Sequence, residues 1–185
     1  MIRKPDPRAS NAASAITHRC GVALGSNMGD RLATLRLAAQ ALRHLADFGQ
    51  PVLVSPVYET APVECAPGAA SFYNAVMEIG FFGTPRQLLE RLQAVESALG
   101  RPAEREKNAP RPIDLDLLYA DGLVVREDGL ILPHPRLAQR RFVLQPLCDI
   151  RPALLLPGET HTVRSLLAAL PADEPPPALI TASWI

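Results

Sequence analysis

The sequence predicts an α+β fold, a ferredoxin-like two-layer sandwich in which helices pack on a mainly antiparallel sheet. Short apolar segments rich in β-branched and aromatic residues alternate with segments whose leucines recur at helical spacing. The expected order is strand, helix, strand, strand, helix, strand, then a hairpin and further helices. Helices that fall between groups of strands are typical of this class. A chain of 185 residues is long enough for one well-packed domain and too short for two.

Local signals define the first elements. Residues 20–24 are apolar and precede Gly25, which predicts a strand that runs into a turn. Residues 30–45 carry apolar side chains at helical spacing and predict the first helix. The next strand covers residues 52–58, and Pro56 inside it favours an edge position or a bulge.

The remaining elements follow in the same way. Thr84 and Pro85 are typical of a helix start, because a hydroxyl can cap the first turn and proline fits there, and Gly100 is expected to end that helix. Residues 101–110 lack apolar periodicity and predict a loop. The other predicted strands are residues 72–82, 113–119, 123–126 and 130–132, and the other predicted helices are residues 140–148 and 163–170.

Both ends of the chain differ in composition from its centre. Residues 1–19 are polar and rich in proline and serine, so they predict a disordered leader. Residues 171–185 contain three consecutive prolines and predict a loose tail that Ile180 and Trp184 could hold in place. The folded domain is therefore expected to span residues 20–170.

Charge and cysteine content exclude several classes of protein. Lys and Arg together number 19, as do Asp and Glu, so the chain lacks the basic surplus of a general nucleic-acid or anionic-membrane binder. Three cysteines, far apart in the sequence, predict neither a disulfide framework nor a structural zinc site. The sequence contains no apolar run long enough to cross a membrane and no signal peptide. A cytoplasmic protein is the expectation.

The most informative segment is the strand predicted at residues 113–119. Alternation along a strand puts Ile113, Leu115, Leu117 and Tyr119 on one buried face. Asp114 and Asp116 then share the other face, with Cα atoms about 6.5–7 Å apart. Two neighbouring carboxylates repel each other unless a cation neutralises them, and Mg²⁺ prefers a few carboxylates together with phosphate oxygens. The alternative is a pair of aspartates on a solvated face.

Three further groups surround this pair in the sequence. The first is a cationic loop, in which guanidinium groups could bind phosphate; it contains Arg101, Arg105, Lys107 and Arg111. A solvated loop balanced by Glu104 and Glu106 is the alternative. The second is a stiff segment around His134 and Arg140, and the third is the strand with Phe72 and Asn74, which could stack on a flat heteroaromatic ring and match its edge.

These residues resemble a known family. Residues 107–118, which read KNAPRPIDLDLL, are similar to the signature of the 6-hydroxymethyl-7,8-dihydropterin pyrophosphokinases of folate biosynthesis. The similarity extends over nearly the whole domain. Further matching segments are residues 23–27, 55–60, 72–76, 93–96, 100–101, 132–136 and 140–147.

The resemblance implies an ATP-dependent transferase. The family moves the β,γ-pyrophosphoryl group of ATP to the hydroxymethyl oxygen of the pterin, releases AMP and uses two Mg²⁺ ions. By this likeness, Asp114 and Asp116 hold both metals, whereas Arg101 and Arg111 neutralise charge on the transferring group. The residues expected to bind the nucleotide are Gln93, Glu96, Lys107, His134 and Arg140.

The same resemblance implies a pterin site. Phe72 and Phe142 would enclose the ring, and Asn74 with backbone groups of Thr60, Pro62 and Val63 would read its edge. The implied partners are small molecules, and a monomer is expected. Two other classes of protein fit the sequence less well. A DxD-type nucleotidyl or glycosyl transferase needs a longer chain, and an RNA-binding ferredoxin-like module needs a basic surplus and a different aromatic motif.

Overall fold

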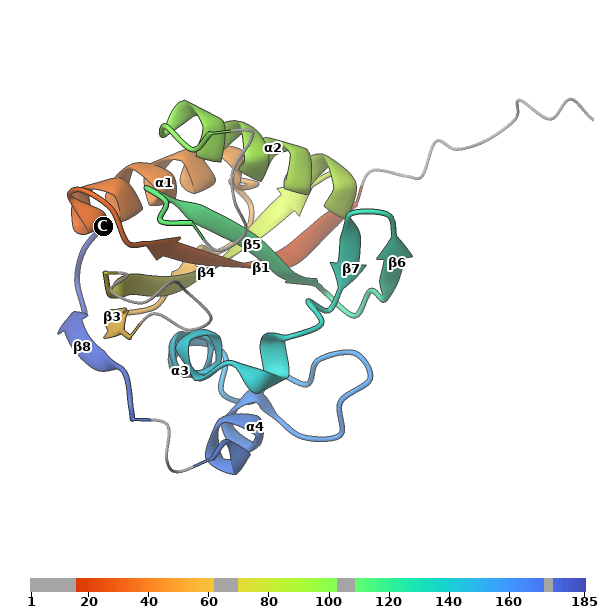
Figure 1. The fold of residues 1–185 in the computed structure, drawn as a ribbon. Coiled ribbons are helices and arrows are strands. Elements are labelled where there is room, and N and C mark those ends of the chain that lie inside the picture. Colours follow the sequence, from red (N-terminus) through yellow and green to blue (C-terminus); the bar gives the residue numbers. More distant parts are fainter. Residues whose placement is uncertain (1–15, 62–69, 103–108, 172–174) are drawn as a thin grey trace, which may run out of the picture.

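The computed structural model describes residues 16–61, 70–102, 109–171 and 175–185. Its main sheet has six strands in the order β5-β1-β4-β3-β8, with β2 also paired to β4, and every pairing is antiparallel (Figure 1). The strands are β1 (Thr17–Ser26), β2 (Leu53–Val54), β3 (Val57–Thr60), β4 (Phe72–Phe82), β5 (Asp114–Ala120) and β8 (Ala178–Thr181). The order of β5, β1, β4 and β3 is that of a ferredoxin-like sheet, so the predicted fold class is confirmed.

Two helices cover one face of the sheet. They are α1 (Arg31–Leu45) and α2 (Pro85–Ala98), and their leucines enter a core with side chains of β1, β4 and β5. Asp30 caps α1 by accepting a hydrogen bond from the backbone of Ala33. Thr84 and Gln87 form a capping box at the start of α2. The start of α2 predicted from Thr84 and Pro85 is therefore correct, and the helix predicted from apolar spacing over residues 30–45 begins where Asp30 caps it.

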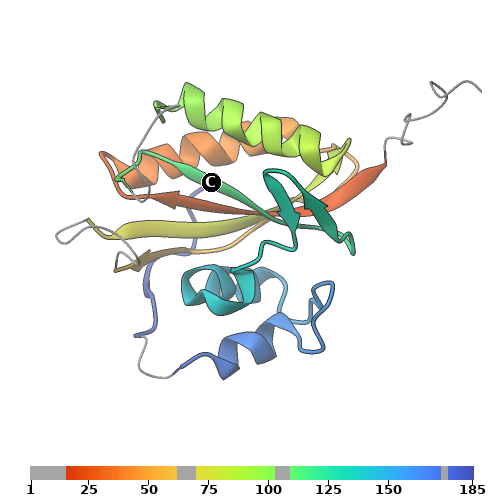
Figure 2. The ribbon, with the colours of Figure 1, turned by 45° about the vertical axis from the view of Figure 1, so that its right-hand side comes forward.

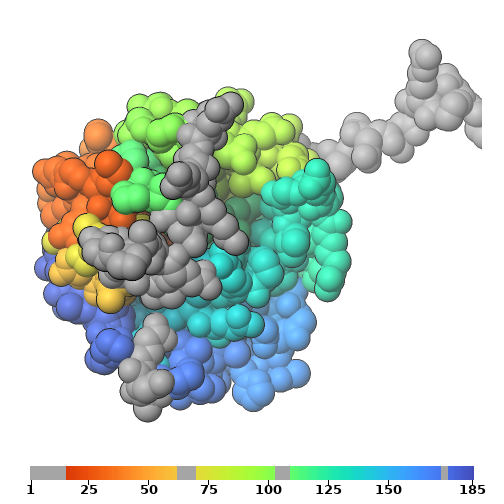
Figure 3. All heavy atoms as spheres, in the orientation of Figure 1, coloured from red at the N-terminus to blue at the C-terminus, as the bar shows by residue number. Residues whose placement is uncertain are grey.

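A second group of helices lies on the other face. α3 (Arg141–Ile150) packs against the sheet and α4 (Val163–Ala169) packs on α3, so that both take part in a separate apolar core (Figure 2). In the space-filling view of Figure 3, α1 and α2 lie in the upper half of the molecule, in orange and green, and α3 and α4 lie in the lower half, in cyan and blue. Both helices were expected, but they add a partial third layer to the two-layer sandwich. A hairpin of β6 (Val125–Glu127) and β7 (Leu130–Leu132) and a 3-10 turn (Leu137–Gln139) connect β5 to α3.

The predicted alternation along β5 is wrong at one residue. Tyr119 does not share a face with Leu117, because the pairing between β1 and β5 shifts register at Gly21 and Val22. This bulge leaves one extra residue on β5 and turns Tyr119 toward the α3 side of the sheet. The Tyr119 hydroxyl there donates to Oε2 of Glu78 at 2.6 Å. Gly21 is required beside it, since a Cβ at that position would lie 2.2 Å from the tyrosine ring.

The folded structure includes more of both termini than the sequence suggested. Residues 17–19 of the predicted leader belong to β1, while residues 1–15 lie outside the described part of the chain. The predicted tail contributes β8, which pairs with β3. Trp184 anchors this segment: its side chain is buried and its Nε1 donates to the carbonyl oxygen of Ser55 at 2.8 Å. Ile180 is exposed and does not share that role.

The length and hydropathy of the helices decide whether any of them could cross a membrane. In the described ranges, none of them is long and apolar enough to span a lipid bilayer.

Candidate active site

Several of the predicted site residues, among them Asp114, Asp116, Phe72 and Asn74, lie at one end of the sheet, on the face that α3 covers. Gly25 near the end of β1 pairs with Asp114 of β5 on one side and with Asn74 of β4 on the other. A Cβ on Gly25 would lie 3.3 Å from Oδ1 of Asn74 and 3.7 Å from Cβ of Asp114. Because Gly25 has no side chain, the side chains of Asp114 on β5 and Asn74 on β4 can approach each other across β1.

Two arginines bind Asp114. Nη1 of Arg101 lies 2.7 Å from Oδ1, and Nη2 of Arg111 lies 2.7 Å from Oδ2. The Arg111 backbone is fixed in turn by Asn27, whose Oδ1 accepts its N–H at 2.8 Å. Both carboxylate oxygens of Asp114 are thus neutralised by guanidinium groups, in the place where a cation is expected.

Glu96 has a positional role. Its side chain is buried in α2, pairs with Arg101, and accepts the backbone N–H of Leu115 at 2.7 Å. One carboxylate therefore joins the end of α2, the start of the cationic loop and β5. Its contacts are with protein groups, which explains its burial and distinguishes it from Gln93, exposed one turn earlier on the same helix.

Asp116 occupies an unfavourable position for a charged carboxylate. Burial raises its pKa above the ordinary value, and the negative charge of Asp114 raises it further. The charges of His134, Arg140 and Arg111 act in the opposite direction. Asp114, His134, Arg140 and Arg111 therefore lie near enough to Asp116 for their charges to influence its pKa.

His134 comes from the connection between β7 and α3. The backbone N–H of His134 donates to the carbonyl oxygen of Leu118 at 2.8 Å, which holds this segment against β5. Burial lowers the pKa of the imidazole, and the neighbouring Asp116 opposes that shift. Arg140 follows at the start of α3, with its guanidinium 5.3 Å from the centre of the Phe142 ring.

The predicted pterin residues lie beside the acidic pair. Asn74 Nδ2 donates to Oγ1 of Thr60 at 2.8 Å, which fixes the orientation of the amide. Phe72, two residues earlier on the same face of β4, is 8% exposed and lies under the Arg111 guanidinium at 5.3 Å. A flat aromatic surface, an oriented amide and a cation therefore adjoin the two aspartates.

Some predicted site residues are not placed with this group. Lys107, Pro62 and Val63 lie outside the described residues. The sequence analysis did not single out Gly25 and Asn27, although both belong to the GSN segment at the end of the first strand. Their polar and small side chains at the end of a buried strand were the available signal.

The donor set suits magnesium better than a tightly chelated metal. Across the described residues, no group of three or more Asp, Glu, His or Cys side chains is arranged to hold an ion. Mg²⁺ commonly takes only one or two protein carboxylates and completes its coordination with water and phosphate oxygens. The unfavourable burial of Asp116 beside Asp114 is the feature that a cation would relieve.

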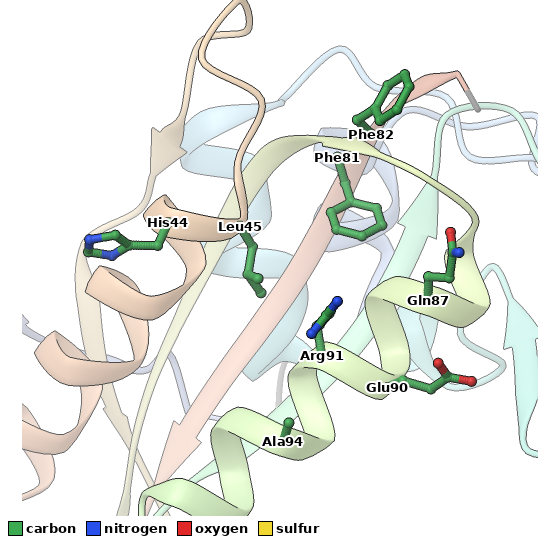
Figure 4. A pocket seen from close by; sticks show the side chains of 8 residues that line it. All are labelled: His44, Leu45, Phe81, Phe82, Gln87, Glu90, Arg91 and Ala94. Carbon is green, nitrogen blue, oxygen red and sulfur yellow. The ribbon is translucent and has the colours of Figure 1, made fainter.

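A separate hollow lies away from this site. It has a volume of about 650 Å³ and is formed on the opposite face of the sheet by α1, α2 and the far end of β4 (Figure 4). Its lining includes His44, Phe81, Phe82 and Arg91, and none of the predicted site residues.

Comparison with known proteins gives a consistent result. Residues 21–152 match the family described as 7,8-dihydro-6-hydroxymethylpterin-pyrophosphokinase (HPPK). The chain is 42% identical over 154 residues to the 2-amino-4-hydroxy-6-hydroxymethyldihydropteridine pyrophosphokinase of Methylorubrum extorquens, which covers 82% of this chain and 93% of that protein. It is 43% identical over 129 residues to the Bacillus subtilis protein of the same name, covering 70% and 75%.

Longer proteins contain a related part. The chain is 39% identical over 137 residues to the folic acid synthesis protein fol1 of Pneumocystis carinii, covering 74% of this chain but only 18% of that protein. Among solved structures, wild-type HPPK-DHPS of Plasmodium falciparum aligns with a TM-score of 0.65 at 13% identity, over 85% of this chain and 45% of that one. This structural likeness supports the fold.

Proposed function

The chain belongs to the 7,8-dihydro-6-hydroxymethylpterin-pyrophosphokinase family, and on that premise we propose that it transfers pyrophosphate from ATP to 6-hydroxymethyl-7,8-dihydropterin in folate biosynthesis. One observation supports this most strongly. Arg111 contacts Asp114 through an ion pair and Phe72 through its guanidinium face, so the proposed metal and pterin positions are neighbours. A pyrophosphoryl donor and an alcohol acceptor must be adjacent in this way.

The transfer makes one bond and breaks one bond. The hydroxymethyl oxygen of the pterin bonds to the β-phosphorus of ATP, the bond from that phosphorus to the oxygen bridging the α- and β-phosphates breaks, and AMP leaves with that oxygen. The hydroxyl proton passes to solvent. Asp114 and Asp116 would hold magnesium, two ions by the family resemblance, which supplies charge neutralisation and makes the hydroxyl more acidic.

The arginines would act on the phosphates. Arg101 and Arg111 now lie against Asp114, and incoming phosphate oxygens would compete with that carboxylate for the same guanidinium groups. Planar guanidinium groups suit the spread charge of the transferring group. His134 and Arg140 lie within electrostatic reach of Asp116 and would bind the remaining nucleotide phosphates, with Gln93 and Lys107 as further candidates.

The pterin would bind beside them. Phe72 and Phe142 provide aromatic surfaces, and the Asn74 amide, already oriented by Thr60, offers a donor and an acceptor for the ring edge. Pro62 and Val63 are further candidates for that edge. We expect a cytoplasmic monomer that acts on small molecules. Because positive and negative residues balance, we expect it to bind neither nucleic acid nor an anionic membrane.

Product analysis tests this proposal. The purified chain is incubated with ATP, Mg²⁺ and 6-hydroxymethyl-7,8-dihydropterin, and nucleotides are separated by anion-exchange chromatography. We expect AMP and the pterin diphosphate in equal amounts, with neither formed when the pterin or Mg²⁺ is omitted. Release of ADP would indicate single-phosphoryl transfer, and no turnover with any of these mixtures would contradict the proposal.

A further inference from the structure

A compact polar cluster lies behind the pterin residues, on the opposite face of the same strands. Arg31, the first residue of α1, donates through Nη1 to Oε1 of Glu59 at 2.9 Å and to the carbonyl oxygen of Ser71 at 2.9 Å. The same nitrogen lies 2.8 Å from the Ser71 hydroxyl, which itself donates to Glu59 Oε1 at 2.5 Å. The guanidinium also stacks 3.8 Å from the centre of the Tyr73 ring.

The register of β3 and β4 links this cluster to the pterin residues. Glu59 is paired with Tyr73, and the next residue, Thr60, is paired with Phe72. Successive side chains on a strand point to opposite faces. Glu59 and Tyr73 therefore face α1, while Thr60 and Phe72 on the adjoining rung face the candidate active site.

The backbone alone gives this part of the sheet little support. β3 has only four residues, and its ladder with β4 comprises three pairs. Its pairing with β8 shifts register between Val57 and Tyr58 and does not reach Thr60. The end of β3 is therefore held by few backbone hydrogen bonds, and side-chain contacts carry more of its positioning.

The charges of the cluster suit such a role. Arg31 and Glu59 are 24% and 34% exposed, so their ion pair is partly shielded from water. The hydrogen bond from Ser71, followed by that from Arg31, lowers the pKa of the Glu59 carboxyl below its ordinary value. The carboxylate is thus ionised at neutral pH and holds three elements together.

We propose that Arg31, Glu59 and Ser71 form a positioning cluster that fixes the ends of β3 and β4, so that Thr60, Phe72 and Asn74 keep the geometry needed to bind a flat, hydrogen-bonding heteroaromatic ring. The inference rests on the proposed function, since it takes the pterin as that ring. These residues touch no substrate; they act through the residues on the other face of the strands.

Ligand binding by the full chain tests the cluster separately from turnover. Arg31→Met removes the charge and keeps the length of the side chain, and Arg43→Met is the matched control, an exposed arginine in the last turn of the same helix. We would titrate each protein with 6-hydroxymethylpterin, followed by its fluorescence, and with Mg²⁺ and α,β-methylene-ATP, followed by calorimetry. Melting temperatures would be measured on the same samples.

The positioning role predicts a selective effect. Arg31→Met should raise the pterin Kd about tenfold, since small displacements at a preorganised site are costly, and leave the nucleotide Kd within about twofold. Glu59→Gln should produce a similar change, and the two substitutions together should add little because they break the same contact. Arg31→Lys, which keeps the charge, should recover part of the affinity.

Other results would overturn the inference. An unchanged pterin Kd in both variants would show that the cluster does not position the site. An equal loss of pterin and nucleotide affinity that follows the fall in melting temperature would show a general structural role. If Arg31→Met does not fold, Ser71→Ala gives the same comparison with a smaller change. A wild-type chain that binds the pterin but releases no AMP would contradict the proposed function alone, and one that binds no pterin would contradict both.

Discussion

Arg111 binds Asp114 through an ion pair of 2.7 Å across three residues of sequence. The same guanidinium lies over Phe72, so it connects the acidic pair with the aromatic surface. Asn27 holds the Arg111 backbone from the turn after β1. The arginine is therefore placed by the sheet itself, at the boundary between the proposed nucleotide and pterin positions.

Replacing Arg111 should slow the chemical step. Arg111→Ala removes a guanidinium aimed at developing phosphate charge, and we expect the rate of pyrophosphoryl transfer to fall by roughly 10²–10³. The pterin Kd should change less, since Phe72 and Asn74 remain. Rapid-quench measurements separate the two effects, with Arg111→Lys as a control for charge without the planar fork. An unchanged transfer rate would show that the residue has another role.

Asp116 should be essential for turnover and unfavourable for stability. Burial and the charge of Asp114 both disfavour its ionised form, so Asp116→Asn removes a repulsion from the metal-free protein. We expect kcat to fall by orders of magnitude while the melting temperature without metal stays equal or rises. Circular dichroism and the AMP assay measure the two properties. A variant with near-normal activity would refute the metal assignment.

The stability difference between these two proteins should depend on pH. The pKa of Asp116 is raised in the folded state, so the folded protein binds this proton more tightly than the unfolded chain. The stabilisation that the raised pKa gives the wild type is therefore fully present below pH 3.8, the ordinary pKa of an aspartate. It is lost as the pH rises through the pKa that Asp116 has in the folded protein. Urea unfolding of metal-free samples should show the wild type losing stability against Asp116→Asn as the pH rises, and a constant difference would contradict the burial argument.

Glu96 should matter for folding more than its neighbours on α2. Glu96→Ala leaves the Arg101 guanidinium without its buried partner and the Leu115 N–H without its acceptor, and we expect a loss of about 3 kcal/mol in unfolding free energy. Glu90→Ala, an exposed change on the same helix, should fall within about 0.5 kcal/mol of wild type. Chemical denaturation compares them, and equal effects would show that Glu96 is not a structural anchor.

Truncation should locate the start of the folded domain. Removal of residues 1–15 should leave stability and AMP release unchanged, because β1 begins at Thr17. Removal of residues 1–19 also deletes Arg19, which donates to buried Glu78 at 2.8 and 2.5 Å, and should destabilise by about 3 kcal/mol. Arg19→Met isolates that contact. Equal stability of the two truncated chains would contradict the assignment of residues 17–19 to the sheet.

Local chemistry explains which parts of the fold the sequence predicts well. α1 follows from apolar side chains at helical spacing, the start of α2 follows from Thr84 and Pro85, and β4 follows from a long run of β-branched and aromatic side chains. β8 was missed because its four residues lie after three prolines, and only the partner strand β3 makes them a strand. Trp184, three residues after β8, indicates that the tail is held against the fold, but its acceptor, Ser55, is 129 residues away in the chain.

The candidate site shows the same difference between features that follow from one segment of sequence and features that depend on tertiary contacts. The shared face of Asp114 and Asp116 follows from alternation along one strand, which the sequence displays directly. The face of Tyr119 depends on a bulge that involves a neighbouring strand, so it could not be read from β5 alone. The contacts of Glu96 with Arg101 and Leu115 are tertiary in the same sense. Residue types indicated the chemistry, and the sheet order was needed to show which residues meet.

Binding of a magnesium nucleotide tests the central claim most directly. Calorimetric titration with α,β-methylene-ATP in the presence and absence of Mg²⁺ would compare the wild type with Asp114→Asn/Asp116→Asn. We expect Mg²⁺-dependent binding by the wild type and its loss in the double variant, with melting temperatures that show both proteins folded. Mg²⁺-dependent binding of equal strength in the two proteins would contradict it, because the paired aspartates would then not hold the metal.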